Sequence, residues 1–159
     1  METYHVGLMG IGAFVVMIGI AFVSWRRRIE SQEAMLSKPV LIEANDSGHK
    51  AMYVATTFAD RPLDRVIAYG LAHRGFCSIS VSSLGVDISR VGEASFRIPG
   101  SSALSVSGSA AVIDKAVEKN GLVSIRWRLD SVELETHLRF VDSNERKAVL
   151  EALSPLVGA

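Results

Sequence analysis

The sequence is poor in cysteine, and its charges cancel. Cys77 is the single cysteine, so the chain cannot form an internal disulfide, which agrees with a reducing compartment such as the cytoplasm. Cys77 shares a predicted strand face with Ile79 and Val81, which predicts a buried structural thiol.

The 17 basic and 17 acidic residues balance. After residue 28 the balance becomes slightly acidic, since Arg26–Arg28 and Glu2 are then excluded. We therefore expect no nucleic-acid partner, which would need a basic face.

Motifs of catalysis and of metal binding are also missing. The sequence has no G-x-S-x-G motif and no G-K-[ST] loop. Glu133 and Glu135 alternate along a predicted strand, which is more typical of a solvated face than of an acid–base pair. Metal-ligand spacing is not found among the four histidines, which are His5, His49, His73 and His137. The sequence thus predicts a protein that is not an enzyme and that needs no cofactor.

One long apolar run dominates the N-terminus. No charged residue lies between Val6 and Trp25. At ~1.5 Å per residue, a helix over this run would be about 30 Å long, the thickness of a bilayer's hydrocarbon core. A cleavable secretion signal carries positive charge before such a run and a small-residue cleavage site after it. Here Glu2 precedes the run and Arg26–Arg28 follow it. We expect a retained membrane anchor; a buried core helix is the alternative.

The flanks of this run predict its orientation. Three arginines on the C-terminal side place that side in the cytoplasm by the positive-inside rule. The predicted protein is therefore a single-pass protein of the cell (plasma) membrane, with its N-terminus outside and its C-terminal domain in the cytoplasm. The predicted membrane-interface residues are Tyr4, Trp25, Arg26, Arg27 and Arg28.

The chain is predicted to have three parts. Residues 1–28 form the transmembrane anchor with its basic flank, residues 29–48 a stalk and linker, and residues 49–159 one folded domain. Good helix formers follow the arginines, so the membrane helix should continue until Pro39 stops it. A short parallel coiled coil through Ile29 and Leu36 is conceivable, so a homo-oligomer is possible.

The folded domain is predicted to be rich in strands. The hydrophobic period changes to two from Lys50 on. We expect strands over residues 50–58, 76–83, 86–91, 95–98, around Val106, and over 122–129 and 132–140. The spacing of Leu63, Val66 and Ile67 predicts a short helix within residues 60–70.

Turns and the C-terminal segment complete this prediction. Asn120-Gly121 is a strong tight-turn signal, and Asp130-Ser131 is the expected loop of the last hairpin. A final amphipathic helix, capped by Asp142 or Ser143, should direct Val149, Leu150 and Leu153 inward. About seven antiparallel strands must close or sandwich to hide their edges. The predicted fold is therefore α+β, a pleckstrin-homology (PH)-like β-barrel or sandwich capped by a C-terminal helix, behind a transmembrane helix.

Four sequence blocks carry a family resemblance. They are YVATT, then L-D-R-V, then R-x-G-E-x-x-F-x-I-P, then G-L-x-x-x-x-W-R-L, in order between residues 48 and 153. This pattern resembles a family of actinobacterial single-pass membrane proteins that carry a bacterial PH-like domain behind an N-terminal helix. The sequence departs from the family at Glu135-Thr136-His137, where an Asp-Thr-Gly-like step is expected. The resemblance implies a PH-like fold and no established activity.

A cluster of basic residues is the remaining candidate site. Arg61, Arg65, His73 and Arg74 surround the predicted short helix. In PH domains that bind lipid headgroups, basic residues converge near the mouth of the barrel, so these four residues are a candidate anion or headgroup contact. Interleaved aspartates favour the competing interpretation, a local salt-bridge network. We expect a membrane-tethered adapter for a protein partner, with inner-leaflet lipid-headgroup sensing as the alternative. The expected partners are the lipid bilayer and an unidentified protein.

Overall fold

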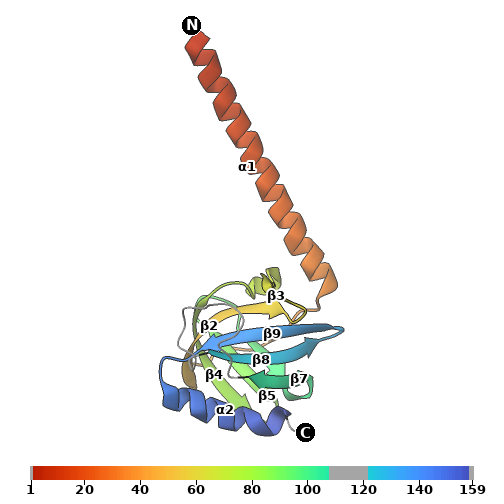
Figure 1. The fold of residues 1–159 in the computed structure, drawn as a ribbon, viewed down its shortest axis with the longest axis vertical. Helices are drawn as coiled ribbons and strands as arrows, with labels where there is room; N and C mark the ends of the chain where they lie inside the picture. The colour runs from red at the N-terminus through yellow and green to blue at the C-terminus, as the bar shows by residue number, and fades with distance from the viewer. Residues whose placement is uncertain (1, 108–121, 158–159) are drawn as a thin grey trace.

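A long N-terminal helix stands on a strand-rich domain (Figure 1). The structure, a computed structural model, describes residues 2–107 and 122–157. Helix α1 runs from Glu2 to Met35 and ends ahead of Pro39, as predicted. Among the described residues, one helix, over Gly7–Met35, is long and apolar enough to cross a membrane by length and composition. The most apolar part of this helix has no burial against the domain.

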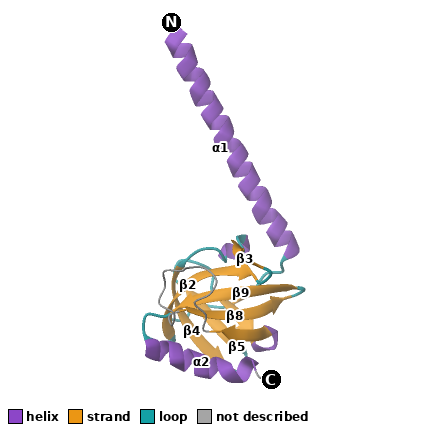
Figure 2. Cartoon of the chain, viewed as in Figure 1, coloured by secondary structure: helices purple, strands orange, loops and turns teal. Residues whose placement is uncertain are grey.

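Within the described residues the domain has one antiparallel sheet of nine strands, two 3₁₀ turns and one further helix (Figure 2). The neighbouring strands follow the order β1-β6-β5-β4-β2-β9-β8-β7, and β3 pairs with β2. Their bounds are β1 Val40–Leu41, β2 His49–Phe58, β3 Arg61–Arg65, β4 Gly75–Ser82, β5 Gly85–Arg90, β6 Phe96–Pro99, β7 Ala103–Ser107, β8 Leu122–Leu129 and β9 Val132–Arg139; the others are η1 Ala68–Gly70, η2 Gly100–Ser102 and α2 Ser143–Val157.

The hairpin β8–β9 forms in the predicted register. Leu129 lies opposite Val132 and Trp127 opposite Leu134. Asp130 in the loop has φ +53°, a left-handed conformation that Asp tolerates better than most residues. Alternation then directs Trp127, Leu134 and their inward neighbours into the core, where Trp127 is fully buried.

The core also holds a chain of polar side chains. The indole N–H of Trp127 donates to Thr136 Oγ1 at 2.9 Å, and the Thr136 and Thr56 hydroxyls lie 2.8 Å apart. Thr56 in turn contacts the Tyr53 hydroxyl at 2.7 Å, which donates to the Leu71 carbonyl at 2.8 Å. Since an unpaired buried polar group costs roughly 1–3 kcal/mol, this continuous chain explains how threonines are tolerated here.

Helix α2 closes the domain on the side away from α1 (Figure 1). Asp142 caps it, because its carboxylate accepts a hydrogen bond from the Asn144 N–H at 2.8 Å. Val149 and Leu153 are buried, and Leu150 packs against the core, as predicted.

The predicted short helix within residues 60–70 is wrong. Residues Arg61–Arg65 form strand β3, paired with β2 through Phe58↔Arg61 and Thr57↔Arg65, and only Ala68–Gly70 are helical, as a single 3₁₀ turn. The side chain of Leu63 is 84 % exposed, so the apolar spacing that indicated a helix did not mark a buried face. Pairing of the backbone with β2 prevailed over the side-chain pattern.

Two further expectations differ from the structure. The interpretation of Glu133 and Glu135 as a solvated face is wrong for Glu135, which is 9 % exposed. Nine strands replace the expected seven within the described residues, since β1 and β3 were not predicted. The brief strand around Val106 is confirmed in β7. The predicted turn at Asn120-Gly121 lies outside the described residues.

Candidate functional site

The junction between α1 and the domain is built from polar contacts to backbone. Gln32, on the last turns of α1, is 6 % exposed. Its side-chain oxygen accepts hydrogen bonds from the backbone N–H groups of Ile67 at 2.6 Å and Ala68 at 3.2 Å. One turn later, Leu36 is buried in the core, and its carbonyl accepts a hydrogen bond from the Tyr69 hydroxyl at 2.9 Å. The helix is therefore docked on the segment around η1.

A second set of contacts ties α1 to β3. The Arg28 guanidinium donates to the Asp64 carboxylate at 2.6 Å. The other carboxylate oxygen of Asp64 accepts from Arg61 at 3.0 Å, and Arg61 lies 3.4 Å from Asp60. The Arg61 guanidinium also stacks 4.6 Å from the centre of the Phe58 ring. These groups are half or more exposed, apart from Asp64 and Phe58, so each ion pair stabilises the fold only weakly.

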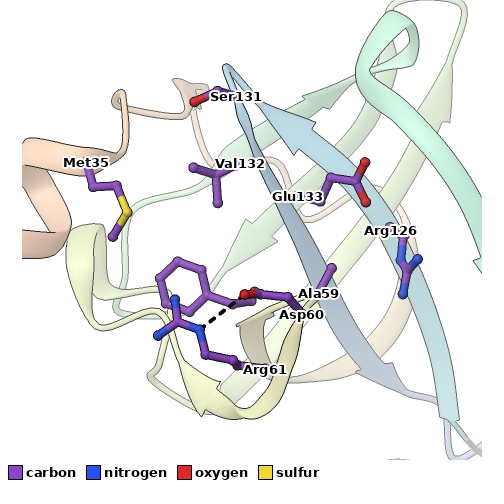
Figure 3. Close-up of a pocket in the computed structure, with 9 residues that line it drawn as sticks. Met35, Ala59, Asp60, Arg61, Arg126, Ser131, Val132 and Glu133 are labelled. Carbon is purple, nitrogen blue, oxygen red and sulfur yellow. Dashed lines mark ion pairs between the residues drawn. The ribbon is translucent and has the colours of Figure 1, made fainter.

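A pocket of about 560 Å³ opens beside this junction, between the end of α1, the β2–β3 turn and the tip of the β8–β9 hairpin (Figure 3). We call it the junction pocket. Its charged groups are two arginines and two carboxylates, and its apolar groups come from α1, β2 and β9. The lining residues are Met35, Phe58, Ala59, Asp60, Arg61, Arg126, Ser131, Val132 and Glu133.

The four residues predicted as a headgroup contact do not all gather at this pocket. Arg61 lines it, and Arg65 is an exposed residue of the same strand. His73 instead lies 2.8 Å from a carboxylate oxygen of Glu93, and the Arg74 side chain contacts the sulfur of Met52. The aspartates near Arg61 form the salt-bridge network that competed with this interpretation.

The predicted membrane-interface residues lie along α1. Tyr4 is in its first turn, and Trp25 is an exposed residue whose ring lies 6.3 Å from that of Phe22. Arg26 and Arg27 are exposed, whereas Arg28 reaches down to the domain through Asp64.

Sequence reasoning missed the residues that join helix and domain. Gln32 and Leu36 both fall within residues 29–48, which were predicted to be a stalk and linker. A polar residue such as Gln32 carries no sign of burial in its own sequence neighbourhood. Met35 and Arg126 were missed as pocket residues for a related reason: the pocket joins segments that are far apart in the chain. The one available signal was the run of good helix formers past residue 28, with Ile29 and Leu36 seven residues apart.

Arg90 is a buried cation that the motif R-x-G-E contains. It is 4 % exposed and stacks 4.9 Å from the Tyr53 ring centre. Its side chain donates to the carbonyls of Ala94 and Gly70, at 2.7–2.9 Å. These contacts tie the β5–β6 loop to the segment that receives α1, so Arg90 supports the junction from within.

Reactive chemistry is weakly represented in the part of the chain that the structure describes. Burial raises the pKa of the Cys77 thiol to about 12, so the thiol is an unreactive core group. Burial lowers the pKa of His137, whose ring contacts the Ser124 and Thr57 hydroxyls. No group of three or more potential metal ligands occurs among the described residues.

An antiparallel sheet of short strands, closed at one side by a C-terminal helix, defines the PH-like class of domains. A family model described as bacterial PH domain-like matches residues 32–154. The chain belongs to this family. The matched region begins at Gln32, the residue that docks α1 on the domain. Searches of curated proteins and of solved structures found no match to the chain. Domains of the PH-like class are typically interaction modules rather than catalysts.

Proposed function

We propose that this protein is a membrane-tethered cytoplasmic adapter without catalytic activity. In this proposal α1 is a retained single-pass anchor of the plasma membrane, its N-terminus lies outside, and the PH-like domain binds a protein partner in the cytoplasm. The similarity of the sequence to actinobacterial single-pass membrane proteins supports the arrangement of anchor and domain.

The charge balance of the junction pocket carries the choice of partner. Arg61 and Arg126 lie in the pocket with Asp60 and Glu133, so its formal charges cancel. A multiply charged phosphate headgroup would need an excess of cations there. A peptide segment that carries both signs and one apolar side chain would match the mixed lining, with Phe58 at its apolar part.

Lipid-headgroup sensing is the second candidate. The observation that favours it is Arg65, an exposed cation on β3 that forms no ion pair with a carboxylate within the described part of the chain. This candidate would use Arg65 with Arg61, His73 and Arg74. Arg61 and His73 already contact carboxylates, which weakens their attraction for an added anion.

Cross-linking from the rim of the junction pocket tests the adapter proposal. A photoreactive phenylalanine at Ser131, in the full chain in its own membrane, should give one or a few defined protein adducts. Arg126→Glu should abolish these adducts, because it reverses one pocket charge, whereas Arg74→Glu should leave them. Adducts that consist of lipid alone, or that are insensitive to Arg126→Glu, would contradict the proposal and favour the lipid candidate.

A reporter fusion tests the orientation. A fluorescent protein joined after Ala159 should be bright, and alkaline phosphatase joined there should be inactive, because the positive-inside rule holds the C-terminal side in the cytoplasm. Replacing Arg26–Arg28 with neutral residues should raise the phosphatase activity. High phosphatase activity in the unchanged protein would refute the orientation.

A further inference from the structure

Strand β3 presents an exposed leucine on the side of the domain that carries the helix. In Figure 1, β3 and η1 lie at the end of the domain from which α1 rises, and α2 lies at the other end. Leu63 at the centre of β3 is 84 % exposed. Arg61 and Arg65 flank it and are exposed on the same strand. The strand therefore combines one free apolar side chain with two cations.

The junction holds β3 at a defined depth relative to the membrane helix. Arg28 contacts Asp64, the residue next to Leu63, at 2.6 Å. Arg28 is one helical turn past Trp25, which is ~4.5 Å of helix rise. A residue within side-chain reach of Arg28 is therefore close to the level at which the hydrophobic part of α1 ends.

The docking of α1 limits how far the domain can swing away from that level. Gln32 binds two backbone N–H groups beside η1, and Leu36 is part of the core. Both residues follow Arg28 within the next two or three helical turns. Helix α1 therefore contacts the domain at β3 through Arg28, at η1 through Gln32 and at the core through Leu36, and no free linker separates helix from domain.

We propose that β3 is a second membrane contact, in which Leu63 enters the headgroup region of the cytoplasmic leaflet and Arg65, beside it on the strand, lies among its anionic headgroups. The inference rests on the proposed function, since it needs α1 to span the membrane. The bilayer is the proposed partner of β3 because β3 lies beside the end of α1 that emerges from the membrane. Because the tether makes the contact intramolecular, a single leucine suffices to bias the domain's orientation.

The charges near Leu63 agree with an anionic surface. Arg28, Arg61 and Arg65 outnumber Asp60 and Asp64, so β3 together with its ion-pair partners carries a formal charge of +1. Cations beside an anionic leaflet are attracted to it. The contact would leave the hairpin tip and α2 free, so the domain would meet its protein partner in one fixed orientation.

Depth-dependent quenching in the full chain tests this contact. Single cysteines are placed at Leu63, at Phe14 within α1, and at Leu84, and are labelled with an environment-sensitive fluorophore. Buried Cys77 stays in place, and the unsubstituted chain measures its background labelling. Leu84 is the matched control, because it is also an exposed leucine, 64 % exposed, in the β4–β5 turn. Its carbonyl accepts a hydrogen bond from the Gly100 N–H of η2, and η2 contacts α2, so Leu84 lies at the end of the domain away from β3.

The proteins are reconstituted in vesicles of phosphatidylcholine and phosphatidylglycerol that contain a spin-labelled lipid. We expect the probes at 14 and 63 to be quenched and the probe at 84 to remain bright. Adding Gln32→Ala should return the probe at 63 toward the level of the probe at 84, because the junction is loosened.

Each other outcome is decisive. If the probe at 14 is quenched and those at 63 and 84 are not, the tether stands and the second contact is refuted. Equal quenching at 63 and 84 refutes the fixed orientation. If the probe at 14 is not quenched, the tether itself fails, and the inference fails with it.

Discussion

The side-chain oxygen of Gln32 accepts a hydrogen bond from the backbone N–H of Ile67 at 2.6 Å, across 35 positions of sequence. It accepts a second hydrogen bond from Ala68. One glutamine thus satisfies two donors of a segment that has left the sheet. The C-terminal end of α1 is, in this respect, a structural part of the PH-like domain.

Removing this side chain should destabilise the domain. Gln32→Ala leaves two backbone donors without their partner, and an unpaired buried donor costs roughly 1–3 kcal/mol. We expect the free energy of unfolding to fall by about that amount, measured by urea denaturation in mild detergent with Trp127 fluorescence in a Trp25→Phe background. Glu33→Ala, at an exposed position one residue on, is the control. Equal effects of the two variants would contradict the role of Gln32.

Two soluble fragments test the predicted domain boundary at residue 49. A fragment of residues 31–159 keeps Gln32 and Leu36, whereas one of residues 45–159 loses both. Burying one leucine stabilises by roughly 1.5–3 kcal/mol, so the longer fragment should be more stable by at least this amount in chemical denaturation. Leu36→Ala in the longer fragment should remove part of the difference, since Gln32 and the pairing of β1 with β6 contribute the rest. Two fragments of equal stability would support the boundary at residue 49.

The hairpin β8–β9 assigns opposite roles to neighbouring residues. Trp127 is fully buried, its ring stacks on Phe96 with centroids 6.2 Å apart, and its N–H binds Thr136. Trp127→Ala should lower the free energy of unfolding by roughly 3–5 kcal/mol. Arg126 is exposed, so Arg126→Ala should change it by less than about 0.5 kcal/mol. Thermal unfolding followed by circular dichroism distinguishes them, and a severe loss with Arg126→Ala would be unexpected.

Alkaline pH should destabilise the fold through Cys77. Burial raises the thiol's pKa from 9.0 to about 12, so the unfolded chain releases this proton at lower pH than the folded chain. The stabilising effect is complete below pH 9 and is lost as pH rises toward 12, by up to about 1.4 kcal/mol per pH unit. Between pH 9 and 10 the slope should flatten in Cys77→Ala. Above pH 10 burial of Tyr53, whose pKa is also raised, adds a second slope. An unchanged slope in Cys77→Ala would argue against this origin.

Mild acid should destabilise the fold through His137. Burial lowers the pKa of this ring below 6.5, with Glu135 opposing and Arg65 reinforcing the shift. The unfolded chain therefore binds a proton that the folded chain resists, and stability present above pH 6.5 is lost as pH falls through the folded pKa. His137→Gln should reduce the loss between pH 7 and pH 5 in urea titrations. The exposed His73 supplies the control, and a similar effect of His73→Gln would refute the assignment.

Local patterns in the sequence determined most of the elements. Alternation around Trp127 predicted the hairpin, its register and its buried face, because side chains of a strand alternate between two faces whatever the surroundings. The apolar run before Arg26 and the amphipathic pattern around Val149 likewise predicted helices α1 and α2. These signals are local, and each element needs only its own residues to display them.

Tertiary structure alone decided what happens where distant segments meet. The leucine at position 63 has helical spacing to Val66, yet pairing with β2 makes its segment a strand and leaves it exposed. Gln32 is a polar residue in a segment predicted to be a stalk, yet its side chain is buried because it accepts hydrogen bonds from two backbone N–H groups beside η1. The junction pocket likewise exists only where α1, the β2–β3 turn and the β8–β9 hairpin come together. A polar group can be buried only where the fold supplies a hydrogen-bond partner, and the residues next to that group in the sequence do not reveal where that partner lies.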